Sequence, residues 1–148
     1  GATRSEEVSQ SQAGAGIVQV VEAGARYRFM NLGVGETRPK PEHETRLQVI
    51  LQQQVLGRPG VQIRFVGHAS SPGSAALNER LARRRAAAFY ALARRLGVPD
   101  SQLAGADRPQ GEGESAPTVG NEDVFGRALN RRVEMFIVVP ATGEGQHE

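Results

Sequence analysis

The sequence predicts an α/β fold of the α+β kind, a two-layer sandwich in which helices cover one face of a mixed sheet. Three observations support this prediction. Short runs that are β-branched or alternate apolar with polar residues indicate strands, two longer segments carry apolar residues at helical spacing, and glycines and prolines separate these segments. The predicted order along the chain is β-β-α-β-α-(β)-β, where the bracketed strand is short.

The N-terminal part of the chain is predicted to hold a tail followed by a hairpin. Residues 1–16 are polar and rich in Ser, Gln, Ala and Gly, a composition typical of a flexible tail or linker. Ile17–Val21 is a compact β-branched run, and aromatic residues alternate with charged ones in Arg26–Leu32, so both segments indicate strands. Gly33–Pro41 contains two glycines and two prolines and is predicted to be a loop.

Two helices and one strand are predicted in the centre of the chain. Glu42–Leu56 indicates the first helix, because its apolar residues recur at helical spacing. Val61–Val66 alternates apolar and polar residues, which is typical of a half-buried strand, and Gly67–Gly73 follows as a loop. Ser74–Leu96 indicates the second helix, which ends before Gly97.

The C-terminal part is predicted to complete the sheet. Ser101–Ala106 is the position of the short bracketed strand, and Asp107–Phe125 is a long loop rich in Gly, Pro and Glu. Val133–Val139 is a strongly apolar strand. Because 148 residues suffice for a single core, residues 17–140 are predicted to form one domain, followed by a flexible tail at 141–148.

One charged residue lies on the apolar face of the second predicted helix. Arg85 follows Leu81 by four residues and precedes Phe89 by four, so the three side chains fall on one side. The other members of this face are Leu77, Ala88, Leu92 and Leu96. A guanidinium among apolar neighbours is costly unless an anion or a set of acceptors meets it. Arg85 is therefore either paired inside the protein or kept for an anionic ligand.

Composition and charge exclude several classes of function. With 39% hydrophobic and 23% charged residues, the chain is an ordinary globular domain, and its net charge of +2 does not require a polyanion. The absence of cysteine excludes disulfides, thiolate catalysis and zinc sites built on cysteine. No apolar run approaches ~18 residues, so no membrane-spanning segment is expected. Nucleic acid is not an expected partner, because no aromatic residues are interleaved with the helix arginines for base stacking.

Catalysis is not expected either. His68 lies close to Ser70 in the sequence, yet no nucleophile-elbow motif or orienting acid accompanies them, so His68 is interpreted as a residue that braces its loop. Glu42–Glu44, with His43 at its centre, is interpreted as an exposed helix start, because adjacent helical residues cannot converge on one ion. Neither a catalytic residue nor a metal or other cofactor is therefore predicted.

Four sequence blocks occur in order along the chain. They are Val66–Gly73, Leu77–Ala86, Gly113–Pro117 and Gly126–Glu134. Together they closely resemble the OmpA-like C-terminal domain family, whose pattern reads Gly-His-Thr-Asp-x-x-Gly, Asn-x-x-Leu-Ser-x-x-Arg-Ala, Gly-Glu-x-x-Pro and Asn-Arg-Arg-Val-Glu. The resemblance covers the chain from Tyr27 to Val139. It implies an OmpA-like two-layer sandwich and a non-catalytic domain that binds peptidoglycan.

The resemblance implies a site for the diaminopimelate side chain of the peptidoglycan stem peptide. In the family, the motif acid meets the ammonium group of this side chain, and the motif arginine meets its carboxylate. Arg85 matches the family arginine. Ser70 stands at the position of the acid and carries no charge, although its hydroxyl can still donate or accept a hydrogen bond.

Further site residues follow from the same resemblance. Asn78 and Asn130 match family asparagines, which either line the pocket or cap and brace its loop. Of two neighbouring arginines, Arg131 is expected at the pocket rim, and Arg132 is expected to pair with an acid such as Glu134 or a loop carboxylate.

Two functions are therefore carried forward. The first is a periplasmic anchor, a piece of a larger outer-membrane or envelope protein that holds it to the cell wall through the stem peptide. The second is an OmpA-like protein–protein interaction module, with other envelope proteins as partners, in which the change to Ser70 has ended wall binding. In the second case Arg85 would be satisfied internally, for instance by a carboxylate of the Glu112–Asp123 loop.

Overall fold

The computed structural model describes residues 18–21, 24–70, 73–113 and 129–139. The predicted α+β sandwich is confirmed. In chain order its elements are β1 (Val18–Val21), β2 (Gly24–Phe29), α2 (Pro41–Gln54), β3 (Gln62–His68), α3 (Ala75–Arg95), the short 3-10 helix η1 (Asp100–Gln102), β4 (Gln110–Glu112) and β5 (Val133–Val138).

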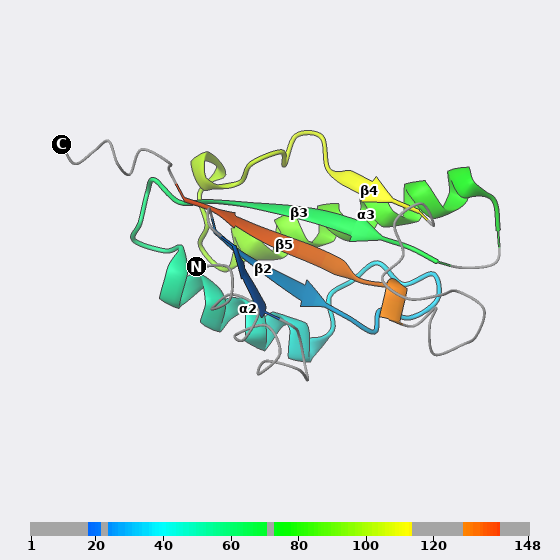
Figure 1. The fold of residues 1–148 in the computed structure, drawn as a ribbon, viewed down its shortest axis with the longest axis horizontal. Coiled ribbons are helices and arrows are strands. Elements are labelled where there is room, and N and C mark those ends of the chain that lie inside the picture. Colours follow the sequence, from blue (N-terminus) through cyan, green and yellow to red (C-terminus); the bar gives the residue numbers. More distant parts are fainter. Residues whose placement is uncertain (1–17, 22–23, 71–72, 114–128, 140–148) are drawn as a thin grey trace.

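The five strands form one mixed sheet in the order β1-β2-β5-β3-β4. Only β3 and β4 run parallel, and the other neighbours are antiparallel. Strand β5 is central: its Met135 lies opposite Tyr27 of β2 on one side and Phe65 of β3 on the other. The long strands lie side by side in Figure 1, with α3 behind them.

The core lies between the sheet and its two helices. Side chains alternate along each strand, so Phe29, Phe65 and Met135 face the same core, where they meet Leu51 of α2 and Phe89 of α3. All five are completely shielded from solvent. The helices therefore cover one face of the sheet only, and polar or charged residues of the same strands lie on the other face.

Helix α3 packs unusually close to the strands beneath it. A Cβ atom added to Gly67 of β3 would lie 1.9 Å from the carbonyl oxygen of Ala82, and one added to Gly111 of β4 would lie 2.3 Å from the backbone nitrogen of Arg83. The buried side of the first turns of α3 is consequently formed by small or polar residues, Asn78 and Ala82. The prediction that Leu77 belongs to this side is wrong, because its side chain is 44% exposed.

The segment between α3 and β5 differs from the sequence-based expectation. Instead of a strand over 101–106, helix η1 ends at Gln102, whose side-chain amide donates to the backbone carbonyls of Val55, Arg58 and Val61. Only Leu103 makes an isolated parallel bridge, to Ile63.

The bracketed strand instead lies inside the predicted loop, as β4. The expected tails, 1–16 and 141–148, and most of the 107–125 loop lie outside the described residues. In the parts of the chain that the structure describes, no helix is long and apolar enough to cross a membrane.

Candidate functional site

The connection between β2 and α2 is a turn that is fixed from several sides. Asn31 and Gly35 both adopt left-handed backbone angles, with φ of 67° and 75°. The backbone amide of Glu36 donates to the carbonyl of Gly33 at 3.0 Å, and the Glu36 carboxylate accepts from the amide of Gly33 at 3.0 Å. These bonds fold residues 33–36 into a compact turn, called the β2–α2 turn below.

His43 holds the same connection from the helix side. Its Nδ1 accepts from the backbone amide of Lys40 at 3.1 Å, and its Nε2 lies 2.7 Å from the carbonyl of Met30, to which it donates in the matching tautomer. The interpretation of His43 as part of an exposed helix start is wrong, because the residue is only 4% exposed. Burial lowers the pKa of His43 and favours this neutral form, although the bond to Met30 and the charge of Glu42 oppose the change.

Arg85 is completely buried, and its guanidinium fastens this turn to the end of β3. Nε donates to the carbonyl of Glu36 at 2.7 Å, Nη2 to the carbonyl of Gly33 at 2.7 Å, and Nη1 to the carbonyl of His68 at 3.0 Å. Its acceptors are therefore neutral carbonyl groups. Within the described ranges, no carboxylate forms an ion pair with Arg85.

A second arginine reaches the same turn from the start of β5. Arg131 is half-buried, its Nε donates to the carbonyl of Leu32 at 2.7 Å, and its own carbonyl accepts from the Leu32 amide at 3.1 Å. Burial and the positive charge of Arg131 lower the pKa of Arg85 to about 10, although the charge of Glu36 opposes the change. With a pKa of about 10, Arg85 is still protonated at neutral pH, so this arginine pair, Arg85 and Arg131, makes the turn a region of concentrated positive charge.

The other predicted site residues, Ser70, Asn78 and Asn130, are all buried. Ser70 follows the end of β3 by two residues and is 1% exposed. Asn78 lies in the first turn of α3, where its side-chain amide donates to the carbonyl of Ser74 at 3.3 Å. Asn130 precedes β5, and its side-chain oxygen accepts from Nη1 of Arg132 at 3.2 Å. Each asparagine therefore makes at least one bond that braces the protein itself.

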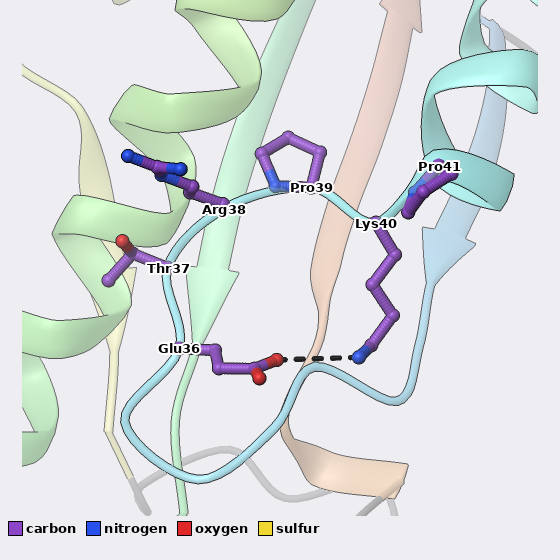
Figure 2. A pocket seen from close by; sticks show the side chains of 6 residues that line it. All are labelled: Glu36, Thr37, Arg38, Pro39, Lys40 and Pro41. Carbon is purple, nitrogen blue, oxygen red and sulfur yellow. Dashed lines mark hydrogen bonds and ion pairs between the residues drawn. The ribbon is translucent and has the colours of Figure 1, made fainter.

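A shallow hollow of about 420 Å³ borders the turn, formed by residues 36–41. Figure 2 shows Glu36 and Lys40 facing one another across it, and their charged atoms lie 3.3 Å apart. The backbone carbonyl of Glu36 is the one that Arg85 binds, so this hollow adjoins the buried arginine. Among the residues described, no cluster of three or more metal-binding side chains is placed to hold an ion.

A second charged cluster lies on the sheet face that the helices leave open. Nε of Arg132 donates to Oε2 of Glu134 at 3.0 Å, Nε of Arg28 lies 3.4 Å from the same oxygen, and Nε2 of His68 lies 3.4 Å from Oε1. The predicted pairing of Arg132 with Glu134 is confirmed. Burial alone would raise the pKa of Glu134, but the contact with His68 and the charges of Arg132 and Arg26 outweigh it and lower the pKa to about 2.

This pKa shift makes stability depend on pH in the acid range. The pKa of Glu134 in the folded protein lies below its ordinary value of 4.5, so the stabilisation is fully present above pH 4.5 and is lost as the pH falls towards 2. We expect up to about 3 kcal/mol to disappear over this range in the wild type. Urea unfolding at about pH 6 and about pH 3 should show about 2 kcal/mol of this loss in the wild type. In Glu134→Gln the difference in stability between the two pH values should be smaller.

Glu112→Gln is the matched control, because Glu112 lies exposed on the same sheet face. It should leave the acid loss of stability unchanged. Parallel pH dependences for the wild type and Glu134→Gln would show that Glu134 is not the titrating group.

Two features of the site could not be predicted from the sequence. The contact of Arg85 with Gly33 joins residues 52 positions apart, and no local pattern encodes it. Predicting the open-face cluster requires the register of β2, β5 and β3. The alternation of charged with aromatic residues in Arg26–Phe29 indicates only that the charged side chains of β2 share one face.

Part of the sequence is similar to a known protein, and the fold is similar to several solved structures. No protein-family model matches the sequence. An outer membrane porin F from Pseudomonas fluorescens is 35% identical over 83 residues, which is 56% of this chain and only 24% of the porin. The chain therefore spans about a quarter of that relative.

Solved structures resemble the chain more completely. The periplasmic domain of Helicobacter pylori MotB superposes with a TM-score of 0.68 at 19% identity, covering 95% of this chain and 89% of that one. The peptidoglycan-associated lipoprotein from Burkholderia pseudomallei gives 0.64 at 24%, covering 73% and 87%. The cell wall anchor of the T6SS from Pseudomonas aeruginosa gives 0.60 at 18%, covering 94% and 96%. The chain shares the fold of these OmpA-like domains.

Proposed function

We propose that the chain is a non-catalytic, periplasmic domain that binds peptidoglycan and anchors a larger envelope protein or machine to the cell wall. Its fold is shared with a peptidoglycan-associated lipoprotein and with a cell wall anchor, which supports a role at the wall. The observation that carries the proposal is the arginine pair: within the described residues, the guanidinium of Arg85 is held by neutral carbonyls and has a second cation, Arg131, as neighbour. Such a site favours an anion.

The anion is the side-chain carboxylate of diaminopimelate in the stem peptide. A guanidinium carries five N–H groups, and the three carbonyls take one on each nitrogen of Arg85. One N–H on Nη1 and one on Nη2 are therefore left to hold a carboxylate with paired bonds. Because Arg85 is completely shielded, part of its cover must move before a ligand can reach it.

The remaining predicted residues complete the site in this proposal. Ser70 and the backbone amides of its loop take the place of the missing acid and meet the ligand's polar groups, and Arg131 and Asn78 line the rim. Asn130 supports the start of β5 through its bond to Arg132. An uncharged hydroxyl forfeits about 1.5–3 kcal/mol relative to a charge-assisted contact, so wall binding should be about ten- to hundredfold weaker than with the acid in place.

A second candidate function is an OmpA-like protein–protein interaction module. The complete burial of Arg85 and its three carbonyl acceptors favour it, because they give the arginine a structural role that needs no ligand. In this function the domain would bind other envelope proteins through a different surface.

Binding to purified sacculi that contain diaminopimelate separates the two functions. We expect weak, saturable binding of the wild type, and Ser70→Asp should strengthen it about ten- to hundredfold by restoring the partner of the ligand ammonium. Ser101→Asp is the matched control, since it adds the same charge at an exposed serine of η1. Lysine-containing sacculi, which lack the side-chain carboxylate, should bind less.

Two outcomes would count against wall binding. If neither the wild type nor Ser70→Asp binds sacculi, the site is not shaped for the zwitterion, and the interaction module is favoured. If Ser70→Asp and Ser101→Asp change binding equally, the effect is one of net charge and not of this site.

A further inference from the structure

The open face of the sheet carries an ordered arrangement of charged side chains. On this face Phe136 of β5 lies opposite Arg26 of β2 on one side and opposite Arg64 of β3 on the other. One step along the sheet, Glu134 of β5 lies opposite Arg28 of β2. The first row therefore holds two cations around an aromatic ring, and the second pairs a cation with an acid.

Within the described residues, no acid forms an ion pair with Arg26 or Arg64, the two arginines of the first row. The guanidinium carbon of Arg64 lies 4.6 Å from the centre of the Phe136 ring, and that of Arg26 lies 6.0 Å from it. Nη1 of Arg64 donates to the side-chain oxygen of Gln110 at 2.9 Å, which is a neutral partner. Nε of Arg26 is shielded from solvent, and no acceptor among the described residues meets it.

The acid of the second row forms its ion pairs with residues outside the first row. Glu134 is already contacted by Arg28, Arg132 and His68. These residues line one groove of about 510 Å³, which also includes Glu112 at its edge. Its four arginines, 26, 28, 64 and 132, outnumber its two glutamates, 112 and 134, so the groove keeps a formal charge of +2 before any charge on His68.

The geometry of the groove selects among anionic partners. Nucleic-acid bases would need the ring of Phe136 as a stacking platform, but guanidinium groups already lie against it. A flat membrane surface does not reach into a groove between strands. A polymer with a charge on every unit would also meet Glu134 and Glu112, whereas carboxylates spaced along a peptide can avoid them.

We propose that this open-face groove binds an acidic, extended peptide segment of a partner protein, whose carboxylates are held by Arg26 and Arg64. The two arginines are separated by two inter-strand spacings, roughly 9.6 Å between backbones. Alternate residues of an extended peptide project to one side about 6.8 Å apart, and the long side chains bridge the difference. Each guanidinium can then bind a carboxylate with paired hydrogen bonds.

This inference does not depend on the wall-binding site. Arg85 lies on α3, which covers the opposite face of the sheet, and the side chains of Arg26 and Arg64 are directed away from it. The variant Arg26→Gln/Arg64→Gln should therefore bind sacculi as the wild type does, and either proposal can fail without the other.

Fluorescence anisotropy with a labelled peptide of alternating glutamate and glycine tests the groove. We expect saturable binding at low ionic strength that weakens as salt is added. Arg26→Gln/Arg64→Gln should weaken it about tenfold or more, the loss of at least one charge-assisted pair. The matched control, Arg84→Gln/Arg95→Gln, removes the same charge from exposed positions of α3 and should change affinity less than about twofold.

Several results would overturn the proposal. They are the absence of saturable binding, equal losses in the two glutamine variants, and tighter binding of a DNA oligonucleotide or of anionic vesicles than of the peptide. Thermal unfolding checks that each variant is folded. If Arg26→Gln/Arg64→Gln is not folded, Arg26→Lys/Arg64→Lys is tested in its place. This variant keeps the positive charge but loses the planar guanidinium, so affinity should fall about threefold or more. Unchanged affinity would refute recognition by paired hydrogen bonds.

Discussion

Alanine in place of Gly67 is expected to destabilise the domain by more than about 3 kcal/mol, the range that severe overpacking of a core reaches. The added Cβ would lie 1.9 Å from the carbonyl oxygen of Ala82, 2.9 Å from its carbonyl carbon and 3.0 Å from the backbone nitrogen of Ala86. All three atoms belong to the backbone of α3, so no side-chain rotation can relieve the contact. Either α3 moves away from β3 or the domain unfolds.

Urea unfolding monitored by circular dichroism measures the loss. Gly57→Ala is the control, because Gly57 has a φ of +81° but open space around its Cβ position, so it carries only the cost of a left-handed backbone, about 1 kcal/mol. Gly111→Ala should also destabilise, but less, since β4 is a short edge strand that can shift. A loss at Gly67 no larger than at Gly57 would mean that the helix adjusts freely.

Removing the side chain of Arg85 is expected to cost about 3–5 kcal/mol of folding stability. Arg85→Ala leaves the carbonyls of Gly33, Glu36 and His68 without their donor in a shielded place and opens a cavity. Arg85→Lys should recover part of the loss, because an ammonium group can serve some of these acceptors but not all three in the same directions. Equilibrium unfolding in urea gives the values.

The neighbouring residue provides the control. Arg84 is exposed on the same helix, and Arg84→Ala should change stability by less than about 0.5 kcal/mol. Hydrogen exchange adds a local measurement: the amides of Gly33 and Glu36 should exchange faster in Arg85→Ala. A loss below about 1 kcal/mol with unchanged exchange would contradict the fastening role. If Arg85→Lys stays folded and still binds sacculi at full strength, Arg85 is not the residue that holds the wall carboxylate.

Local patterns were enough to predict most of the fold. The two helices and four of the five strands were located within about three residues, because their apolar spacing and the glycines and prolines between them are visible in the sequence. Errors arose where a distant contact decides the structure. Gln102 donates to carbonyls of the α2–β3 connection and lies in a 3-10 helix instead of a strand. Leu77 is exposed because the opposite side of α3 packs directly against glycines of β3 and β4.

The candidate site was predicted only in part for the same reason. Placing Arg85 on the inner side of its helix needed nothing but helical spacing, and the structure buries it completely. The hydrogen-bond acceptors of Arg85 could not be predicted, because every residue has a backbone carbonyl and the sequence does not indicate which of them lie near the guanidinium. The pairing of Arg132 with Glu134 could be predicted because residues two positions apart in an extended segment lie on the same face of the sheet. The row of Arg26, Phe136 and Arg64 requires the register of three strands.

That the acceptors of Arg85 are backbone carbonyls has a consequence for sequence variation. The three bonds themselves require no particular side chain at Gly33, Glu36 or His68, because their acceptors are backbone oxygen atoms. Insertion or deletion of a residue in the β2–α2 turn, in contrast, would carry two of the three oxygen atoms away from the guanidinium. Among homologous chains, an arginine at this position should therefore go with a constant length of the turn and not with a constant composition.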